Sequence, residues 1–329
     1  MKRILHLVMT EIGKSIDKAI EYLLNDEVIG IPTETVYGLA GNALKPEVVV
    51  KIFEIKNRPY FNPLIVHTYS FEKSWDYVET WDARLIKLAE AFSPGPITFL
   101  LPKKKIIADL VTAGSSKVAI RIPNQALTLE ILRNLPFPLA APSANPFGYV
   151  SPTTAEHVWN NLKGKIPYIL DGGPCTIGLE STIVGVENEL LVVYRLGGIT
   201  LEDMEKIVGK INKVHLSSSK PQAPGMLLQH YAPQKNIWVT NDLKKFLTLH
   251  SDDNLGVIFY GEILGSFKYF LNLSYNQSLT EAAQNFFDAL RAIENWNVDY
   301  VVIQWFEERG LGRALNDKLK RAAVKIVNY

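Results

Sequence analysis

Apolar residues along the first 208 positions recur at two spacings, and the alternation predicts an α/β domain. Helical spacing over residues 16–24 predicts a helix that ends just before a short apolar strand, "VIGI". Pro46 favours the start of a second helix, which carries Lys56 at its end. Further strands are predicted at "LIVHTY", "ITFLLP", "VAIRIP", "PLAAPSA", "YILDGG", "STIVGV" and "LLVVYRL", with helices near residues 83–91, 127–135 and 155–162. Because helices separate only some of the strands, we expect a mixed twisted sheet with helices.

The pattern changes after Val208. Residues 209–233 contain three consecutive serines and three prolines without sustained periodicity, which is typical of a linker. Beyond it, strands at "NIWVT", "NLGVIFYG" and "VDYVVIQW" alternate with helical patterns over residues 243–249, 279–296 and 314–326. We therefore predict a first domain over residues 1–208, a linker over 209–233, and a small Rossmann-like α/β domain over 234–329.

Length and charge limit the classes of protein to consider. At 329 residues, the chain exceeds the usual size of one hydrophobic core, which supports two domains. Hydrophobic residues make up 47% of the sequence, as expected of a folded protein. The net charge of +1 gives no strong field for holding a polyanion, which argues against a nucleic-acid coat.

The single cysteine and the N-terminal residues indicate a compartment. Cys175 has no partner for an internal disulfide and offers no zinc site, as is typical of a reducing compartment. The start "MKRILHLVMTEIGKS" has a brief apolar run, but Glu11, Lys14 and Asp17 interrupt it too early for a signal peptide. No apolar stretch approaches the roughly 20 residues of a membrane span. We therefore expect a cytoplasmic protein.

The stretch "GIPTETVYGLAGNAL", residues 30–44, follows the first strand and is rich in hydroxyl groups. A loop at the carboxyl end of a strand is a common ligand site in α/β proteins. The stretch lacks the Gly-Lys-Ser/Thr ending of a P-loop and the three-glycine spacing of a dinucleotide fingerprint. A ligand bound at this stretch would therefore be bound by a geometry that differs from both of these nucleotide-binding loops.

The segment "KNRPYFNPLIVH" contains two cations, Lys56 and Arg58, followed by Asn62 and His67. Cations this close together can clamp a phosphate chain if Pro59 turns both side chains inward. A basic helix end that complements the helix dipole accounts for the same pattern. Spacing alone leaves both interpretations open.

Arg121 stands in the predicted strand "VAIRIP" and also has two interpretations. Strand alternation places it on the face opposite Val118 and Ile120, where it can simply face solvent. If it lies inside the fold, the cost of burying an unpaired charge requires an anion beside it. A ligand with a carboxylate is one candidate for that anion.

The remaining polar residues are more typical of turns than of a catalytic or ligand-binding site. Four of them stand in turns rich in Pro and Gly, where such side chains commonly bond to their own backbone: Ser143, Asn145, Ser151 and Ser181. His67 and His157 have no second ligand at metal-binding spacing. "GLGRAL" at Gly310 predicts a helix start, because it lacks the third glycine of a nucleotide fingerprint. No catalytic triad has a plausible spacing, so an enzyme of this sequence would work by positioning and electrostatics, with a substrate group as nucleophile.

Taken in order, these segments resemble the L-threonylcarbamoyladenylate synthase family, in its long two-domain form with a YrdC-type catalytic domain. The resemblance rests on "PTETVYGLAGNA", "KIFEIKNRPYFNPLIVH", "SPGPITFLLP", "VAIRIP", "APSAN", "SPTTAEHV", "DGG", "ESTIVG" and "YRLGGI", which occur in the family's order. "APGMLLQHYAP" matches the linker of the long form. Together these motifs cover nearly the whole chain and are highly specific.

The resemblance implies a reaction and its substrates. L-threonine, bicarbonate or carbon dioxide, and ATP would give threonylcarbamoyl-AMP and pyrophosphate, and the product would be passed to the machinery that makes threonylcarbamoyladenosine on tRNA. The threonine amine would become a carbamate whose oxygen attacks the α-phosphorus, so no side-chain nucleophile is required. Mg²⁺ would accompany ATP, bound mostly by phosphates and water.

The resemblance also implies site residues. Threonine would contact Thr35, His67, Arg121, Ala141 and Ser181, with Arg121 pairing the carboxylate. ATP would contact Lys56, Arg58, Asn62, Lys117, Ser143, Ser151, Arg195 and Tyr231, with Lys117 acting mainly through its backbone. Lys56 and Arg58 are the expected catalytic residues. The linker would act as a lid, with Tyr231 covering the site.

Two other functions share features with this sequence. Hydrogenase-maturation carbamoyltransferases share the YrdC-type domain but carry cysteine-rich zinc fingers, which a single cysteine excludes. A non-catalytic RNA-binding module would need stronger positive charge than +1 for high affinity. We therefore expect weak or no direct RNA binding and no membrane association.

Overall fold

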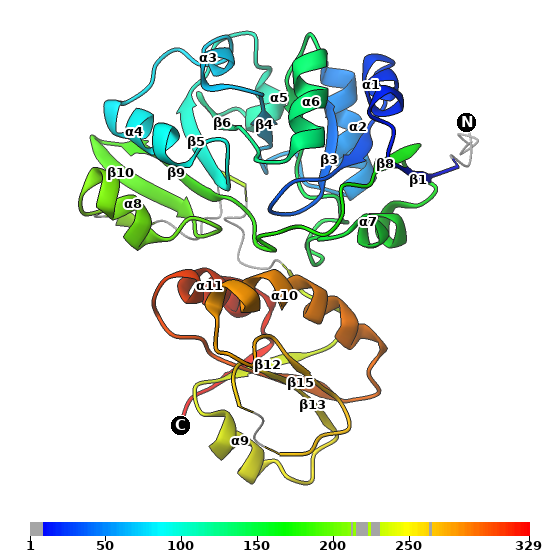
Figure 1. Ribbon diagram of the computed structural model, residues 1–329, viewed down its shortest axis with the longest axis vertical. Helices are drawn as coiled ribbons and strands as arrows, with labels where there is room; N and C mark the ends of the chain where they lie inside the picture. Colours follow the sequence, from blue (N-terminus) through cyan, green and yellow to red (C-terminus); the bar gives the residue numbers. More distant parts are fainter. Residues whose placement is uncertain (1–8, 212, 215–222, 225–230, 263–264) are drawn as a thin grey trace.

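The first domain is a large mixed sheet with helices packed against it (Figure 1). The computed structural model describes residues 9–329 except 212, 215–222, 225–230 and 263–264. Among these residues, eleven strands form one sheet in the order β1-β8-β2-β3-β7-β4-β6-β5-β9-β10-β11. The strands are β1 (Glu11–Gly13), β2 (Ile29–Ile31), β3 (Gly38–Asn42), β4 (Ile65–His67), β5 (Ile97–Pro102), β6 (Lys117–Arg121), β7 (Leu139–Ala140), β8 (Tyr168–Leu170), β9 (Thr182–Glu187), β10 (Leu190–Arg195) and β11 (Lys213–Val214).

Most helices of this domain begin after a residue whose side chain caps them. They are α1 (Ile16–Leu24), α2 (Pro46–Lys56), α3 (Phe71–Ser74), α4 (Ala83–Phe92), α5 (Asp109–Thr112), α6 (Ala126–Asn134), α7 (Ala155–Leu162) and α8 (Leu201–Val208). Ser15 caps α1 by accepting a hydrogen bond from the Lys18 backbone N–H at 3.2 Å. Pro46 opens α2, and Asn57 ends it in the left-handed conformation with φ 51°. The predicted bounds of α1 and α2 are confirmed.

The second domain is a smaller α/β unit whose strands all run parallel. Its described residues form a sheet in the order β14-β13-β15-β12-β16. The elements are β12 (Ile237–Thr240), α9 (Leu243–Leu249), β13 (Leu255–Phe259), β14 (Phe270–Asn272), α10 (Leu279–Ala292), the 3-10 helix η1 (Ile293–Asn295), β15 (Tyr300–Gln304), α11 (Leu311–Ala322) and β16 (Lys325–Val327). The prediction of a mixed sheet plus a small Rossmann-like domain is confirmed.

Several element predictions were incomplete or wrong. The "GLAGN" part of residues 30–44 is strand β3, antiparallel to β2. The helix predicted over residues 314–326 begins earlier, after Gly310, and ends at Ala322. The chain then forms β16, because "KIV" pairs with the free edge of β12. Strand β14 is only three residues long and was missed, and helix α8 was missed although Leu201, Met204 and Val208 recur at helical spacing.

Helices α10 and α11 of the second domain face the first domain (Figure 1). Gln284 Nε2 donates to the Thr176 carbonyl at 2.6 Å, and Arg291 donates to the Ser151 carbonyl at 3.4 Å. Arg313 pairs with Glu202 at the other end of the contact. The two domains therefore touch directly as well as through the linker. The predicted domain boundaries at residues 208 and 233 stay predictions.

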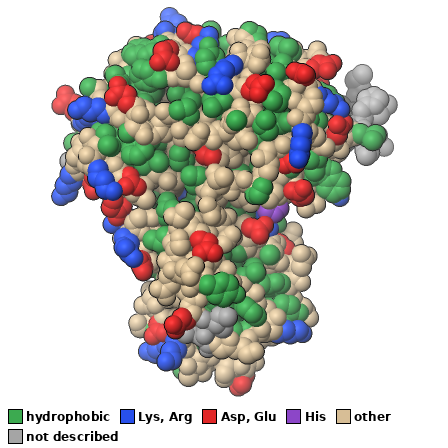
Figure 2. All heavy atoms as spheres, in the orientation of Figure 1, with side chains coloured by type: hydrophobic (Ala, Val, Ile, Leu, Met, Phe, Trp, Pro, Cys, Tyr) green, Lys and Arg blue, Asp and Glu red, His purple; other side chains and the backbone are tan. Residues whose placement is uncertain are grey.

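The visible surface carries charges of both signs. On the face shown in Figure 2, acidic and basic side chains are interspersed over both domains. Within the described residues, no helix combines the length and apolarity needed to cross a membrane.

Candidate active site

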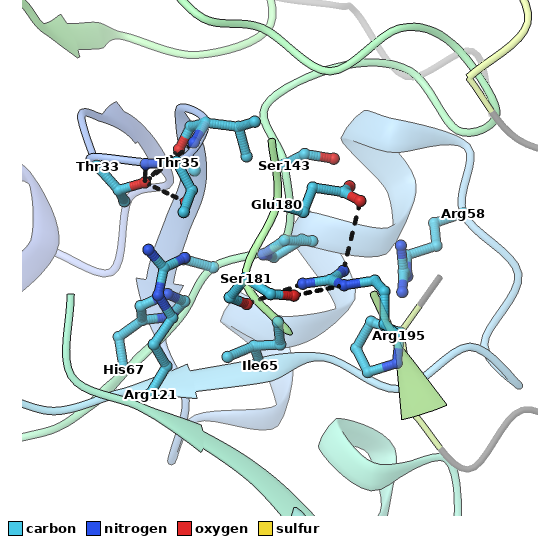
Figure 3. Close-up of a pocket in the computed structure, with 15 residues that line it drawn as sticks. Thr33, Thr35, Arg58, Ile65, His67, Arg121, Ser143, Glu180, Ser181 and Arg195 are labelled. Atoms are coloured by element: carbon cyan, nitrogen blue, oxygen red, sulfur yellow. Dashed lines mark hydrogen bonds and ion pairs between the residues drawn. The ribbon is translucent and has the colours of Figure 1, made fainter. Parts of the chain in front are cut away.

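A pocket forms where strand ends from both halves of the first sheet meet (Figure 3). Its lining residues are Thr33, Thr35, Val36, Gly38, Arg58, Ile65, His67, Arg121, Ala141, Pro142, Ser143, Glu180, Ser181, Arg195 and Pro224. His67 and Arg121 are register partners at the ends of the parallel strands β4 and β6. Ser181 precedes β9, and Arg195 ends its antiparallel neighbour β10. Sheet pairing therefore brings together residues that are far apart in the sequence.

The hydroxyl-rich loop after β2 forms one wall. The Thr33 hydroxyl donates to the Val36 carbonyl at 2.6 Å and accepts from the Thr35 backbone N–H at 3.1 Å, which closes a tight turn. The Thr35 hydroxyl lies 2.8 Å from the Thr33 hydroxyl. Since the Thr33 proton goes to Val36, Thr35 donates in this pair and keeps its lone pairs for other partners. The wall therefore offers backbone groups and a hydroxyl instead of a phosphate loop.

Arg121 is buried, so the interpretation that it faces solvent was wrong. Its side chain is 4% exposed, and Nη2 donates to Glu34 Oε1 at 2.7 Å. The anion beside it in this structure is thus the protein's own carboxylate, which is 6% exposed. The second Glu34 oxygen is buried and has no hydrogen-bond partner among the described residues. Glu34 neutralises Arg121 and fixes where its guanidinium points.

His67 stands beside Arg121 as a neutral imidazole. Burial, reinforced by the neighbouring Arg121 cation, lowers the pKa of His67 to about 3. Its Nδ1 atom is buried and has no hydrogen-bond partner among the residues that the structure describes. A neutral ring can donate from one nitrogen and accept at the other without repelling an adjacent cation. This side of the pocket suits a small group that carries both a carboxylate and polar hydrogens.

The opposite side of the pocket carries Arg58 and Arg195 (Figure 3). Arg195 donates from Nε to the Ser181 carbonyl and from Nη2 to the Ser181 hydroxyl, both at 2.9 Å. Glu180 lies 3.8 Å from Arg195. Burial, and then the Arg195 cation, lower the pKa of Arg58 to about 9. Two buried guanidinium groups that repel each other favour a ligand with several negative charges.

Lys56 does not line the pocket with Arg58. It is 1% exposed, and its ammonium donates to the Ser143 and Asn145 carbonyls at 2.5 and 2.6 Å. Lys56 stands in the last turn of α2, as a basic helix end would, but its side chain is buried and bonded to a neighbouring loop. Burial and the Arg58 cation lower its pKa well below the usual range. Lys56 holds the loop whose Ser143 lines the pocket.

The other expected nucleotide contacts lie around the pocket and not on its lining. Both amide atoms of the Asn62 side chain are buried without a hydrogen-bond partner among the described residues. Lys117 turns away and donates to the Val186 carbonyl at 2.6 Å. The Ser151 hydroxyl donates to Glu180 at 3.3 Å. Tyr231 is fully buried and donates its hydroxyl to Glu180. Residues 225–230, the rest of the expected lid, lie outside the described residues.

Sequence reasoning missed the two carboxylates. Glu34 stands between two threonines in "PTETVY", and Glu180 stands in "ESTIVG". Both segments were singled out, but no spacing rule reveals which cation a glutamate meets across the sheet. No cluster of three or more metal-binding side chains occurs among the described residues.

The family models match both domains. Residues 21–197 match the Sua5, YciO and YrdC model, described as "Telomere recombination". Residues 199–324 match the C-terminal domain of threonylcarbamoyl-AMP synthase.

Individual relatives align over nearly the whole chain. Threonylcarbamoyl-AMP synthases from Pyrococcus abyssi and Bacillus subtilis are 35% and 36% identical, over 92% and 94% of this chain and 92% of each relative. The crystal structure of Pyrococcus abyssi Sua5 complexed with L-threonine has a TM-score of 0.89 at 34% identity, covering 98% of this chain and 99% of that one. This chain is therefore an enzyme of the threonylcarbamoyl-AMP synthase family.

Proposed function

We propose that this pocket joins L-threonine, bicarbonate or carbon dioxide, and ATP into threonylcarbamoyl-AMP, with release of pyrophosphate. The observation that carries the proposal is the division of the pocket into two sides. One side holds Arg121 with a neutral His67, and the other holds Arg58 and Arg195. An amino acid and a polyphosphate need these two environments at adjacent places.

Threonine binds on the Arg121 side. Its carboxylate pairs with the guanidinium that Glu34 orients, and Thr35, His67, Ala141 and Ser181 surround the rest of it. The small Ala141 and the hydroxyl groups leave room for a short polar side chain. A structure of a Pyrococcus abyssi relative complexed with L-threonine supports this ligand.

ATP binds on the Arg58 side, with its phosphates between Arg58 and Arg195. Glu34 already pairs with Arg121, so Glu180 is the single carboxylate among the described lining residues against Arg58 and Arg195, and this side of the pocket keeps a surplus of positive charge. The other nucleotide contacts are proposed at Lys56, Asn62, Lys117, Ser143, Ser151 and Tyr231. Mg²⁺ enters as part of the MgATP substrate, because phosphates and water satisfy most of its coordination.

The reaction needs no side-chain nucleophile. The threonine amine adds to carbon dioxide and loses a proton, which gives a carbamate. A carbamate oxygen then attacks the α-phosphorus, and the bond to the β-phosphate oxygen breaks with its electrons leaving on pyrophosphate. Arg58 stabilises the charge that develops on the departing group, and the protein positions both substrates. Lys56 acts by holding the loop of Ser143.

We also propose that the product serves tRNA threonylcarbamoyladenosine formation in the cytoplasm. The interspersed surface charges and the net charge of +1 support weak or no direct RNA binding.

Pyrophosphate release tests the proposal. The full chain is incubated with MgATP and bicarbonate, with threonine, with serine or without an amino acid, and the adenylate is identified by mass spectrometry. We expect pyrophosphate and adenylate in equal amounts, dependent on threonine and bicarbonate. Release that ignores either substrate would refute the proposal.

A further inference from the structure

A lysine of the second domain reaches the edge of the pocket. Lys318, on α11, is fully buried, and its ammonium donates to the Leu196 carbonyl at 2.9 Å. Leu196 directly follows Arg195, so this bond holds the end of β10 that presents Arg195 to the pocket.

The same ammonium lies next to the pocket's carboxylate. Lys318 Nζ is 4.0 Å from Glu180 Oε2 and 5.3 Å from the centre of the Tyr231 ring. Glu180 also accepts hydrogen bonds from Tyr231 and Ser151 and is 3.8 Å from Arg195. Glu180 is thus shared between cations of both domains.

Domain packing alone does not explain why a charged lysine is buried at this position. Burying an ammonium is costly, and an apolar side chain of similar length would fill the same space. The cost is offset by the Leu196 carbonyl, by the Asp317 and Glu180 carboxylates at 3.9 and 4.0 Å, and by an aromatic ring, and of these Leu196 and Glu180 belong to the chain segments that carry pocket residues. The lysine is placed where it influences the charge of the pocket.

We propose that Lys318 is a positioning residue for the nucleotide side of the active site. It fixes the strand end that carries Arg195, and it shares the Glu180 carboxylate with Arg195. Without the Lys318 charge, Glu180 would pair more closely with Arg195 and cancel the cation that faces the phosphates. The inference rests on the proposed function, because it assigns ATP to this side of the pocket.

The test compares variants of the full chain. K318M removes the charge at similar length, K318R keeps it, and K320M is the matched control because Lys320 is exposed on the same helix. We expect K318M to raise the KM for ATP about tenfold and to change the KM for threonine less than threefold. K318R and K320M should stay within about threefold of the wild type for both substrates.

A double variant separates charge placement from packing. In K318M/E180Q the neutral amide has no charge with which to cancel Arg195, so the ATP affinity lost in K318M should largely return. If K318M raises both KM values equally, or if E180Q gives no rescue, the proposal is wrong. If K318M fails to fold by circular dichroism, K318Q and K318Q/E180Q give the same comparison.

Binding of a non-hydrolysable ATP analogue distinguishes this inference from the proposed function. Calorimetry measures its affinity for the wild type and K318M without any turnover. A wild type that binds the analogue but forms no adenylate would overturn the proposed function alone. Equal analogue affinity in the wild type and K318M would overturn the role of Lys318 alone.

Discussion

Replacing His67 by glutamine should make the free energy of unfolding less sensitive to mild acid. The imidazole is 2% exposed, and burial together with Arg121 lowers its pKa from an ordinary 6.5 to about 3. Between these values the unfolded chain binds a proton that the folded protein does not. Stability therefore rises with pH across this window and falls as the pH is lowered through it.

The size of the effect follows from the two pKa values. Each pH unit within the window changes the free energy of unfolding by at most about 1.4 kcal/mol. Between pH 7 and pH 5, a folded pKa near 3 and an unfolded pKa of 6.5 correspond to a loss of about 2 kcal/mol. Glutamine does not titrate, so H67Q should lack this contribution.

Urea unfolding of wild type and H67Q at both pH values measures the difference directly. S181A serves as a control, because Ser181 lines the same pocket and does not titrate, so its effect on stability should be equal at pH 7 and pH 5. H67Q should lose about 2 kcal/mol less than the wild type between these values. Equal losses in wild type and H67Q would refute a neutral, buried His67.

Three further predictions test the two sides of the pocket. R121K should raise the KM for threonine about tenfold and leave that for ATP nearly unchanged, because lysine loses two-point pairing with a carboxylate; an equal rise for both would indicate collapse of β6. E34Q should lower the free energy of unfolding in urea by about 3 kcal/mol, since it leaves the Arg121 charge buried without its partner; a loss under about 1 kcal/mol would contradict the ion pair. R58A should slow pyrophosphate release by about 10² to 10³ with a near-normal urea midpoint; wild-type turnover would remove Arg58 from the phosphate side.

Elements with regular periodicity could be predicted from the sequence, and edges of the sheets could not. The amphipathic spacing of residues 16–24 and the proline at position 46 specify their helices locally. Strand β16 depends on a free edge of β12, which only the folded domain provides. Three residues, "KIV", are too few to show a period of their own, so the helical pattern before them was extended through them.

The site could be predicted only in part, mainly because the sequence does not show where each side chain points. Lys56 and Arg58 are two residues apart, and both interpretations treated them as a pair. The left-handed Asn57 between them ends α2, so Lys56 points to the carbonyl oxygens of the 143–145 loop and Arg58 points into the pocket. Likewise, Glu34 and Arg121 meet across the sheet, 87 positions apart. Such pairings depend on strand order, which local patterns do not contain.

The pocket tolerates its surplus of positive charge because the protein's own oxygens replace water around each cation. Arg195 donates to Ser181, Arg58 donates to the Asn62 and Pro63 carbonyls at 3.1 and 2.8 Å, and Lys56 donates to two loop carbonyls. These acceptors are dipoles, so they orient the cations without cancelling them, and Glu180, 3.8 Å from Arg195, is the one carboxylate among the described residues that line the pocket. A carboxylate partner for each cation would stabilise the folded protein but leave no charge for the phosphates. The shortage of carboxylates on the Arg58 side is therefore what makes this side of the pocket suited to a polyanion, as the proposed binding of ATP requires.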